Sequence, residues 1–265
     1  MRPARLVMKS GLGWLIFSAV VLLGAAFLFF AKAGPSAPIQ QGGIQTGISK
    51  KEVAAIFRQY LLDHPEIVAE AMQRLEARER AAEAAAAKSV LASRADELLH
   101  DGASPVGGNA EGDVTLVEFF DYNCPYCRQV APLMVKAEAA DPQLRLVYKE
   151  FPILGASSTF AAKAALAAHR QGKYVPFHAA LIESKGTLTE NGILDAASRL
   201  GLDLARLKAD MTDPAIQAAI HHNLALARAL HINGTPGFVI GEEIVTGAVD
   251  LATVERLIRE AREKK

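Results

Sequence analysis

The sequence predicts an α/β fold preceded by an all-helical segment, and three observations carry this prediction. A β-rich run, VTLVEFF at residues 114–120, leads directly into a stretch with helical periodicity. A second β-rich run follows at residues 144–151, at the spacing of a helical crossover, so we expect the two strands to be parallel. Near the C-terminus, GFVIGEEIVTG at residues 237–247 has the pattern of a short β-hairpin that turns at Gly241 to Glu243.

The first residues predict export from the cytoplasm. Arg2, Arg5 and Lys9 precede an uncharged apolar run at residues 11–31, which is long enough to span a bilayer as a helix. Ala31 and Ala33 have the spacing of a signal-peptidase site, so residues 1–33 are either a cleaved signal peptide or, as we favour from the length of the apolar run, a membrane anchor. Both alternatives place the rest of the chain in the periplasm or another extracytoplasmic space. A Gly-, Pro- and Gln-rich linker follows at residues 34–47.

Residues 48–100 have a helical pattern that is distinct from the rest of the chain. Ser49 is a good N-cap, Pro65 marks a break between two helices, and residues 76–95 are mainly alanine and charged residues. Large apolar residues recur at helical spacing before that alanine-rich part: Val53, Ile56, Phe57, Tyr60, Leu61, Ile67, Val68, Met72 and Leu75. This stripe could pack on the main domain as a hairpin, or it could associate with copies of itself. We favour an oligomerisation segment through residues 48–75, because the alanine-rich helix offers little surface on which to bury the stripe.

The main domain is expected over residues 104–265. Residues 156–232 are almost wholly helical in pattern, with breaks at Gly172, Gly186 and Gly201, and Asp250 can cap a final helix that ends near Glu263. The order of strand, helix, strand, helical insertion, hairpin and helix predicts a thioredoxin fold with an inserted helical subdomain.

Cys124 and Cys127 are the only two cysteines in 265 residues, and they form a single CPYC motif. A disulfide across so short a loop adds little stability, and the compartment is oxidising, so the pair is expected to be redox-active. Cys124 lies at a strand-to-helix junction, where the helix N-terminus stabilises a thiolate, and Pro125 fits the first helical turn. We therefore expect Cys124, nearer solvent, to attack and Cys127, one turn further in, to resolve the mixed disulfide, with no cofactor beyond this dithiol.

Three stretches carry a family resemblance: VEFFDYNCPYC, VYKEFPILG and GTPGFVIG. They resemble the DsbA family of extracytoplasmic thiol–disulfide oxidoreductases over roughly residues 104–263. The N-terminal helices are more similar to those of the oligomeric members, such as ScsC and the DsbC and DsbG isomerases.

The resemblance implies further roles. Glu118 matches a buried acid that relays protons to Cys127, although a paired structural carboxylate is the alternative interpretation. Pro236 matches a cis-proline that faces the CxxC motif, and the backbone of Thr235 is expected to pair with substrate, while Pro125 and Tyr126 contribute to substrate binding and redox poise. A threonine before this proline favours disulfide shuffling over pure oxidation. The implied partners are unfolded or misoxidised exported proteins and a membrane redox partner.

Other functions are less consistent with the sequence. A copper-binding or copper-tolerance protein that uses the same thiols is the alternative function, since thiolates select soft metals. His221 and His222 are adjacent on a helix and point in different directions, so no metal site is predicted. His178 is expected to be a packed helix residue rather than a catalytic base. The net charge of zero gives no sign of a nucleic-acid partner.

Overall fold

The computed structural model describes residue 47 and residues 49–264. The predicted export segment at residues 1–33 and most of the predicted linker therefore lie outside the described residues. Within the described part of the chain, no helix combines the length and the apolar character needed to cross a membrane.

The chain divides into two compact units, residues 1–62 and 63–265. The described part of the first unit consists of Gly47, Ser49 and helix α1 (Lys50–Asp63) as far as Leu62, and all side chains of α1 are exposed. Ser49 caps α1 as predicted. Glu52 N donates to Ser49 Oγ at 3.3 Å and Ser49 N donates to Glu52 Oε2 at 2.8 Å, which is the reciprocal pattern of a capping box.

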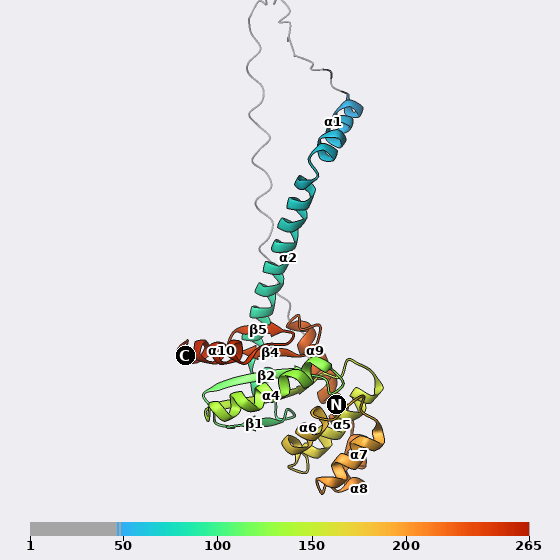
Figure 1. Ribbon diagram of the computed structural model, residues 1–265, viewed down its shortest axis with the longest axis vertical. Coiled ribbons are helices and arrows are strands. Elements are labelled where there is room, and N and C mark those ends of the chain that lie inside the picture. The colour runs from blue at the N-terminus through green and yellow to red at the C-terminus, as the bar shows by residue number, and fades with distance from the viewer. Residues whose placement is uncertain (1–46, 48, 265) are drawn as a thin grey trace, which may run out of the picture. The chain divides into compact units, whose positions relative to one another are not determined.

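The second unit is built on a mixed five-stranded sheet (Figure 1). Its strands are β1 (Val106–Gly108), β2 (Val114–Phe120), β3 (Leu144–Glu150), β4 (Gly237–Ile240) and β5 (Glu243–Thr246). They lie in the order β1-β3-β2-β4-β5. The predicted parallel pairing is that of β2 with β3, and the other neighbours are antiparallel. Strand β1 was not predicted, because the short sequence VGG carries no alternating pattern.

The helices follow the predicted order. Helix α4 (Pro125–Ala140) connects β2 to β3, and α10 (Leu251–Glu263) follows the hairpin, with Asp250 Oδ1 accepting from Thr253 N at 2.7 Å. The insertion between β3 and β4 consists of α5 (Ala156–His169), α6 (Tyr174–Ile182), α7 (Glu190–Arg199), α8 (Leu204–Met211) and α9 (Pro214–Ala229). The three predicted breaks fall between these helices, where Gly172, Gly186 and Gly201 have positive φ angles of 69, 75 and 66°.

Each face of the sheet has its own core. On one face Leu116, Phe120, Leu146 and Tyr148 pack with α4, α10 and the insertion. On the other face Val117, Phe119 and Val147 pack with Leu91 and Leu98, together with the end of α9. The even and odd residues of each strand thus serve different layers, as the two-residue repeat of a strand requires.

Helix α2 (Glu66–Ser93) reaches this second core only at its C-terminal end, where Ala87 and Leu91 are buried (Figure 1). The short helix α3 (Ala95–Leu99) continues the contact through Leu98. The last part of the predicted segment 48–100 is therefore part of the sheet's own core, whereas the large apolar side chains of its first part, from Val53 to Leu75, are exposed or nearly so.

Candidate active site

The two cysteines lie where β2 passes into α4. Strand β2 ends at Phe120, and Cys124 occupies the N-cap of α4 with extended backbone angles, φ −75° and ψ 119°. Pro125 is the first helical residue, where its lack of an N–H has no cost. Cys124 N donates to Asp121 O at 3.0 Å, which closes the turn that presents the thiol. This is the strand-to-helix junction that the sequence predicts.

The two thiols have different surroundings. Cys124 is 4% exposed and Cys127 is fully buried, so Cys124 is the nearer to solvent, as expected, but both are buried in the structure. Burial raises the pKa of Cys127 well above its ordinary value, and the neighbouring Glu118 and Cys124 raise it further. Burial therefore favours the protonated form of Cys127.

Thr235 and Pro236 face Cys124 from a distant part of the chain. The Thr235–Pro236 peptide bond is cis, as the resemblance implies. Cys124 Sγ donates to the carbonyl oxygen of Thr235 at 3.2 Å. Pro236 is buried and leads directly into β4, whereas Thr235 is partly exposed. The backbone of Thr235 therefore lies beside the sulfur of Cys124.

Glu118 is a buried carboxyl in the middle of the sheet. It pairs with Tyr148 of β3 on one side and with Phe238 of β4 on the other. Burial raises the pKa of Glu118 to about 8, and its charge in turn raises the pKa of Cys127. The structure thus brings the predicted acid into electrostatic contact with the buried thiol.

Pro125 and Tyr126 lie at the surface beside the thiols. Both side chains are exposed, and the Tyr126 ring is 60% exposed.

Three residues that the sequence analysis missed hold the loop before Cys124. Asp121 is buried, and its Oδ2 accepts from the backbone N–H groups of Ile153 and Leu154, each at 2.9 Å. Asn123 donates through Nδ2 to Ser157 Oγ at 2.9 Å and to Ser158 Oγ at 3.0 Å. Its Oδ1 accepts from Leu188 N at 3.0 Å. The residues that precede the thiol are thus fixed to the helical insertion.

Tyr122 is the third of these residues. It is buried, and its hydroxyl donates to Oε1 of Glu150 at 3.0 Å. Arg128, one turn into α4, donates through Nε to Tyr122 O at 2.8 Å and through Nη1 to Gly186 O at 2.5 Å. A charged residue inside a β-rich run, as in VYKEF, was the sequence signal that could have singled out Glu150.

The histidines considered in the sequence have other roles. His178 packs among Phe120, Tyr122, Tyr148 and Tyr174, and burial lowers its pKa to about 3. His221 contacts Gln217 at 2.8 Å, and His222 lies 3.2 Å from Glu97. Within the part of the chain that the structure describes, no group of three or more His, Cys, Asp or Glu residues could hold a metal ion.

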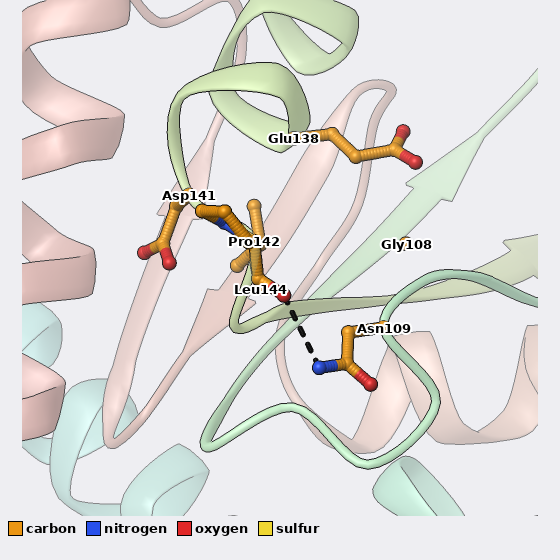
Figure 2. Close-up of a pocket in the computed structure, with 6 residues that line it drawn as sticks. All are labelled: Gly108, Asn109, Glu138, Asp141, Pro142 and Leu144. Atoms are coloured by element: carbon orange, nitrogen blue, oxygen red, sulfur yellow. Dashed lines mark hydrogen bonds between the residues drawn. The ribbon is translucent and has the colours of Figure 1, made fainter.

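A small polar hollow lies beside the edge strand β1 (Figure 2). Its lining comes from the β1 end and from the turn between α4 and β3: Gly108, Asn109, Glu138, Asp141, Pro142 and Leu144. Asn109 bridges the two segments by donating to Pro142 O at 3.1 Å through Nδ2 and to Leu144 O at 2.9 Å through its backbone N–H. None of the predicted site residues lines this hollow.

Comparison with known protein families gives two matches in the chain. Residues 115–259 match the DSBA-like thioredoxin domain, and residues 50–82 match the N-terminal domain of the copper resistance protein ScsC.

Solved structures agree with these matches. A thioredoxin-like oxidoreductase from Silicibacter pomeroyi DSS-3 is 49% identical, covering 63% of this chain and 97% of its own, with a TM-score of 0.62. Proteus mirabilis ScsC in a transitional conformation is 34% identical, covering 82% of this chain and 96% of its own, with a TM-score of 0.62.

Curated relatives include the thiol:disulfide interchange protein DsbA of Bordetella pertussis, which is 28% identical over 60% of this chain and 81% of its own length. The chain also matches Na⁺/H⁺ antiporters of the NhaA type. It spans about a quarter of their length, as with the 24% of the Salinispora arenicola protein that it covers at 29% identity.

The family match covers more than half of the chain, and it contains the CPYC motif at the junction of β2 and α4 and the cis-proline segment before β4. The chain belongs to the DsbA-like thioredoxin family of thiol–disulfide oxidoreductases.

Proposed function

We propose that the protein is an extracytoplasmic disulfide isomerase and oxidase that exchanges disulfides with exported proteins at Cys124 and Cys127. The observation that carries the proposal is the contrast between the two thiols. Cys124 lies at a helix N-terminus beside the Thr235 carbonyl, whereas Cys127 is fully buried and stays protonated. An attacking thiol and a resolving thiol need these two environments.

The proposed reaction balances as a two-electron exchange. In the oxidising direction, a substrate thiolate attacks Sγ of Cys124, the Cys124–Cys127 bond breaks, and Cys127 leaves as a thiolate that takes a proton from Glu118. The second substrate thiol then loses its proton to solvent, and its thiolate attacks the substrate sulfur of the mixed disulfide, which forms the substrate disulfide and releases Cys124 as a thiolate. Glu118 regains its proton from solvent. In shuffling, the Cys124 thiolate attacks a wrong substrate disulfide and is later displaced by another substrate thiol, so no net oxidant is consumed.

Substrate binding is proposed at the surface around Cys124. The exposed ring of Tyr126 and the half-exposed side chain of Leu154 supply apolar contact area beside the thiol turn, since Asp121 holds Leu154 to that turn. The Thr235 backbone is proposed to pair with an extended segment of the substrate, as in strand addition. These contacts suit unfolded polypeptides, which expose both backbone and apolar side chains.

The experiment that tests this function is the refolding of a disulfide-scrambled protein and of its fully reduced form. We expect a protein of residues 47–265 to restore the activity of the scrambled protein, and we expect the Cys124→Ser variant to lose this ability. Failure of the wild-type protein in both assays, with both thiols free and the fold intact by circular dichroism, would contradict the proposal.

Binding of Cu(I) by the same two thiols is the second candidate function. It is favoured by the match of residues 50–82 to a domain named for copper resistance and by the preference of thiolates for soft metals. Metal analysis of the protein, purified with and without reductant, separates the candidates: copper at one equivalent per chain supports metal binding, and its absence after loading with Cu(I) excludes it.

A further inference from the structure

A second buried carboxyl, Glu150, lies on the same face of the sheet as Glu118. Glu118 of β2 is opposite Tyr148 of β3, and Phe120 of β2 is opposite Glu150. The two glutamates are therefore diagonal neighbours on adjacent strands, and because their residue numbers are even in both strands, their side chains lie on the face that packs against α4 and α6. Only 1% of Glu150 is exposed.

Glu150 has an environment suited to a negative charge. The hydroxyls of Tyr122 and Tyr174 both donate to its Oε1, at 3.0 and 2.7 Å. Hydrogen bonds donated to a carboxylate favour its ionised form. The Tyr122 hydroxyl also lies 3.2 Å from Nδ1 of His178, a ring that burial keeps neutral.

The two carboxyls are electrostatically linked. Burial raises the pKa of Glu118 to about 8. The pKa of Glu150 is also raised to about 8, because burial outweighs the Tyr174 and Tyr122 hydroxyl bonds, which lower it, and the charges of Asp121 and Glu118 raise it further. The first of the two protons therefore leaves the pair as the pH rises towards 8. The two hydroxyl donors on Glu150 favour ionisation of Glu150 over that of Glu118. Lys149 is the neighbour of Glu150 in β3, but its side chain lies on the opposite face of the sheet, where it binds Asp101 and not the carboxyl pair.

We propose that Glu150 is a positioning residue for the thiol chemistry: the Tyr122 and Tyr174 hydroxyls hold it as the charged member of a buried carboxyl pair, and its charge keeps the proton on Glu118. This inference rests on the proposed function, in which Glu118 protonates the leaving Cys127. The titratable groups that face the pair come from several elements: Asp121 and Tyr122 before α4, Cys124 and Cys127 at the start of α4, Tyr148 of β3, His169 of α5, and Tyr174 and His178 of α6.

Three variants should each change the pH at which Glu118 ionises, and all in the same direction. Glu150→Gln removes the charge but keeps the shape, so Glu118 should lose its proton more easily. Tyr122→Phe and Tyr174→Phe each remove one donor from Glu150, which then competes better for the proton, so Glu118 should again ionise at lower pH. Tyr148→Phe is the matched control: this tyrosine is opposite Glu118 in the sheet, but its hydroxyl lies beside Gly107 of β1, whereas the hydroxyls that donate to Glu150 are those of Tyr122 and Tyr174.

The test is a carbon-13 NMR titration of the glutamate carboxyl groups in the reduced protein, with Glu118→Gln used to assign the Glu118 signal. We expect Glu150→Gln to move the Glu118 midpoint to lower pH by about one unit, and each of the two Tyr→Phe variants to move it in the same direction by less. The Tyr148→Phe midpoint should match that of the wild type. Thiol exchange is measured on the same samples, so that loss of the proposed function is seen separately.

A purely structural role for Glu150 gives a different result. It would lower the melting temperature of Glu150→Gln and leave the Glu118 midpoint where it is in the wild type, which would overturn the inference even if exchange activity persists. A Glu118 midpoint that moves to higher pH would overturn it as well.

Discussion

At the scale of single residues, Cys124, the proposed nucleophile, is held in place by the side chains that precede it. Asp121, Tyr122 and Asn123 each bind a different part of the chain: the 153–154 loop, Glu150 of β3, and the start of α5 with Leu188. A flexible thiol would spend much of its time away from the Thr235 carbonyl. Fixing the turn on three sides keeps Cys124 where a bound disulfide can reach it.

Asn123→Ala tests this arrangement. The change leaves Leu188 N and two serine hydroxyls without their Asn123 partner, so we expect the free energy of unfolding to fall by about 1–3 kcal/mol. The rate of disulfide exchange should fall with it. Urea denaturation and an exchange assay measure the two effects. Asn109→Ala, which removes an exposed bridge to Pro142, is the control and should cost less than about 1 kcal/mol.

Glu118 gives a prediction for stability against pH. Its pKa rises from 4.5 to about 8 on folding, so its stabilising contribution is complete below pH 4.5 and is lost as the pH rises through 8. Glu118→Gln has no such dependence. From pH 4.5 to pH 9 the wild type should therefore lose roughly 3–5 kcal/mol of unfolding free energy relative to the variant. Denaturation across this pH range measures the unfolding free energy of both proteins. If the two free energies change with pH in parallel, the pKa of Glu118 is not raised and the prediction is wrong.

At the scale of elements, the sequence predicted those whose pattern is local. Helical spacing predicted α1 and α2, Pro65 predicted their separation, and the β-rich runs predicted β2 and β3 with the CPYC motif between them. Three features could not be predicted in this way. Burial of Leu91 and Leu98 against the sheet, the pairing of β1, and the contacts of Glu150 all depend on residues far away in the sequence.

Lys149 joins strand β3 to helix α3 and to the turn that follows α3. Its side chain is fully buried, and its ammonium donates to Glu97 O at 2.8 Å, to Ser104 Oγ at 2.7 Å and to Asp101 Oδ2 at 3.1 Å. Burial lowers the pKa of Lys149, and the carboxylate of Asp101 opposes that effect. The ammonium therefore fixes α3 and the turn after it to β3.

Asp101→Asn should therefore be costly. It leaves a buried ammonium without its counter-charge, and because Asp101 is partly exposed we expect a loss of about 2 kcal/mol in unfolding free energy. The double variant Asp101→Asn with Lys149→Met removes both charges and should recover most of that loss. Urea denaturation of the two variants checks this, and a double variant that is less stable than Asp101→Asn alone would contradict it.

At the scale of the whole molecule, we propose that an N-terminal association segment is separate from the domain that carries the thiols. The apolar side chains from Val53 to Leu75 are exposed or nearly so, and the match to the ScsC N-terminal domain covers residues 50–82. Since α2 joins the core of the sheet from Ala87 onward, the two parts are best divided before that residue. Several thiol sites in one assembly could attack a trapped substrate repeatedly, which favours isomerisation.

Removing residues 1–82 tests the separation, with a protein of residues 47–265 as the control. We expect light scattering to show an oligomer for the control and a monomer for the shorter protein. The monomer should keep or gain dithiol oxidase activity and lose most of its isomerase activity. A control protein that is already monomeric would refute self-association, and unchanged isomerase activity after truncation would refute its link to shuffling.

The most direct test of the central claim is to trap the exchange intermediate. A peptide disulfide is incubated with a protein of residues 47–265 carrying Cys127→Ser, and the adduct is located by mass spectrometry after proteolysis. We expect a mixed disulfide between the peptide and Cys124 on nearly every chain. In the Cys124→Ser protein we expect almost none on Cys127, because Cys127 is buried and stays protonated. Equal trapping at the two cysteines, or none at Cys124, would contradict it.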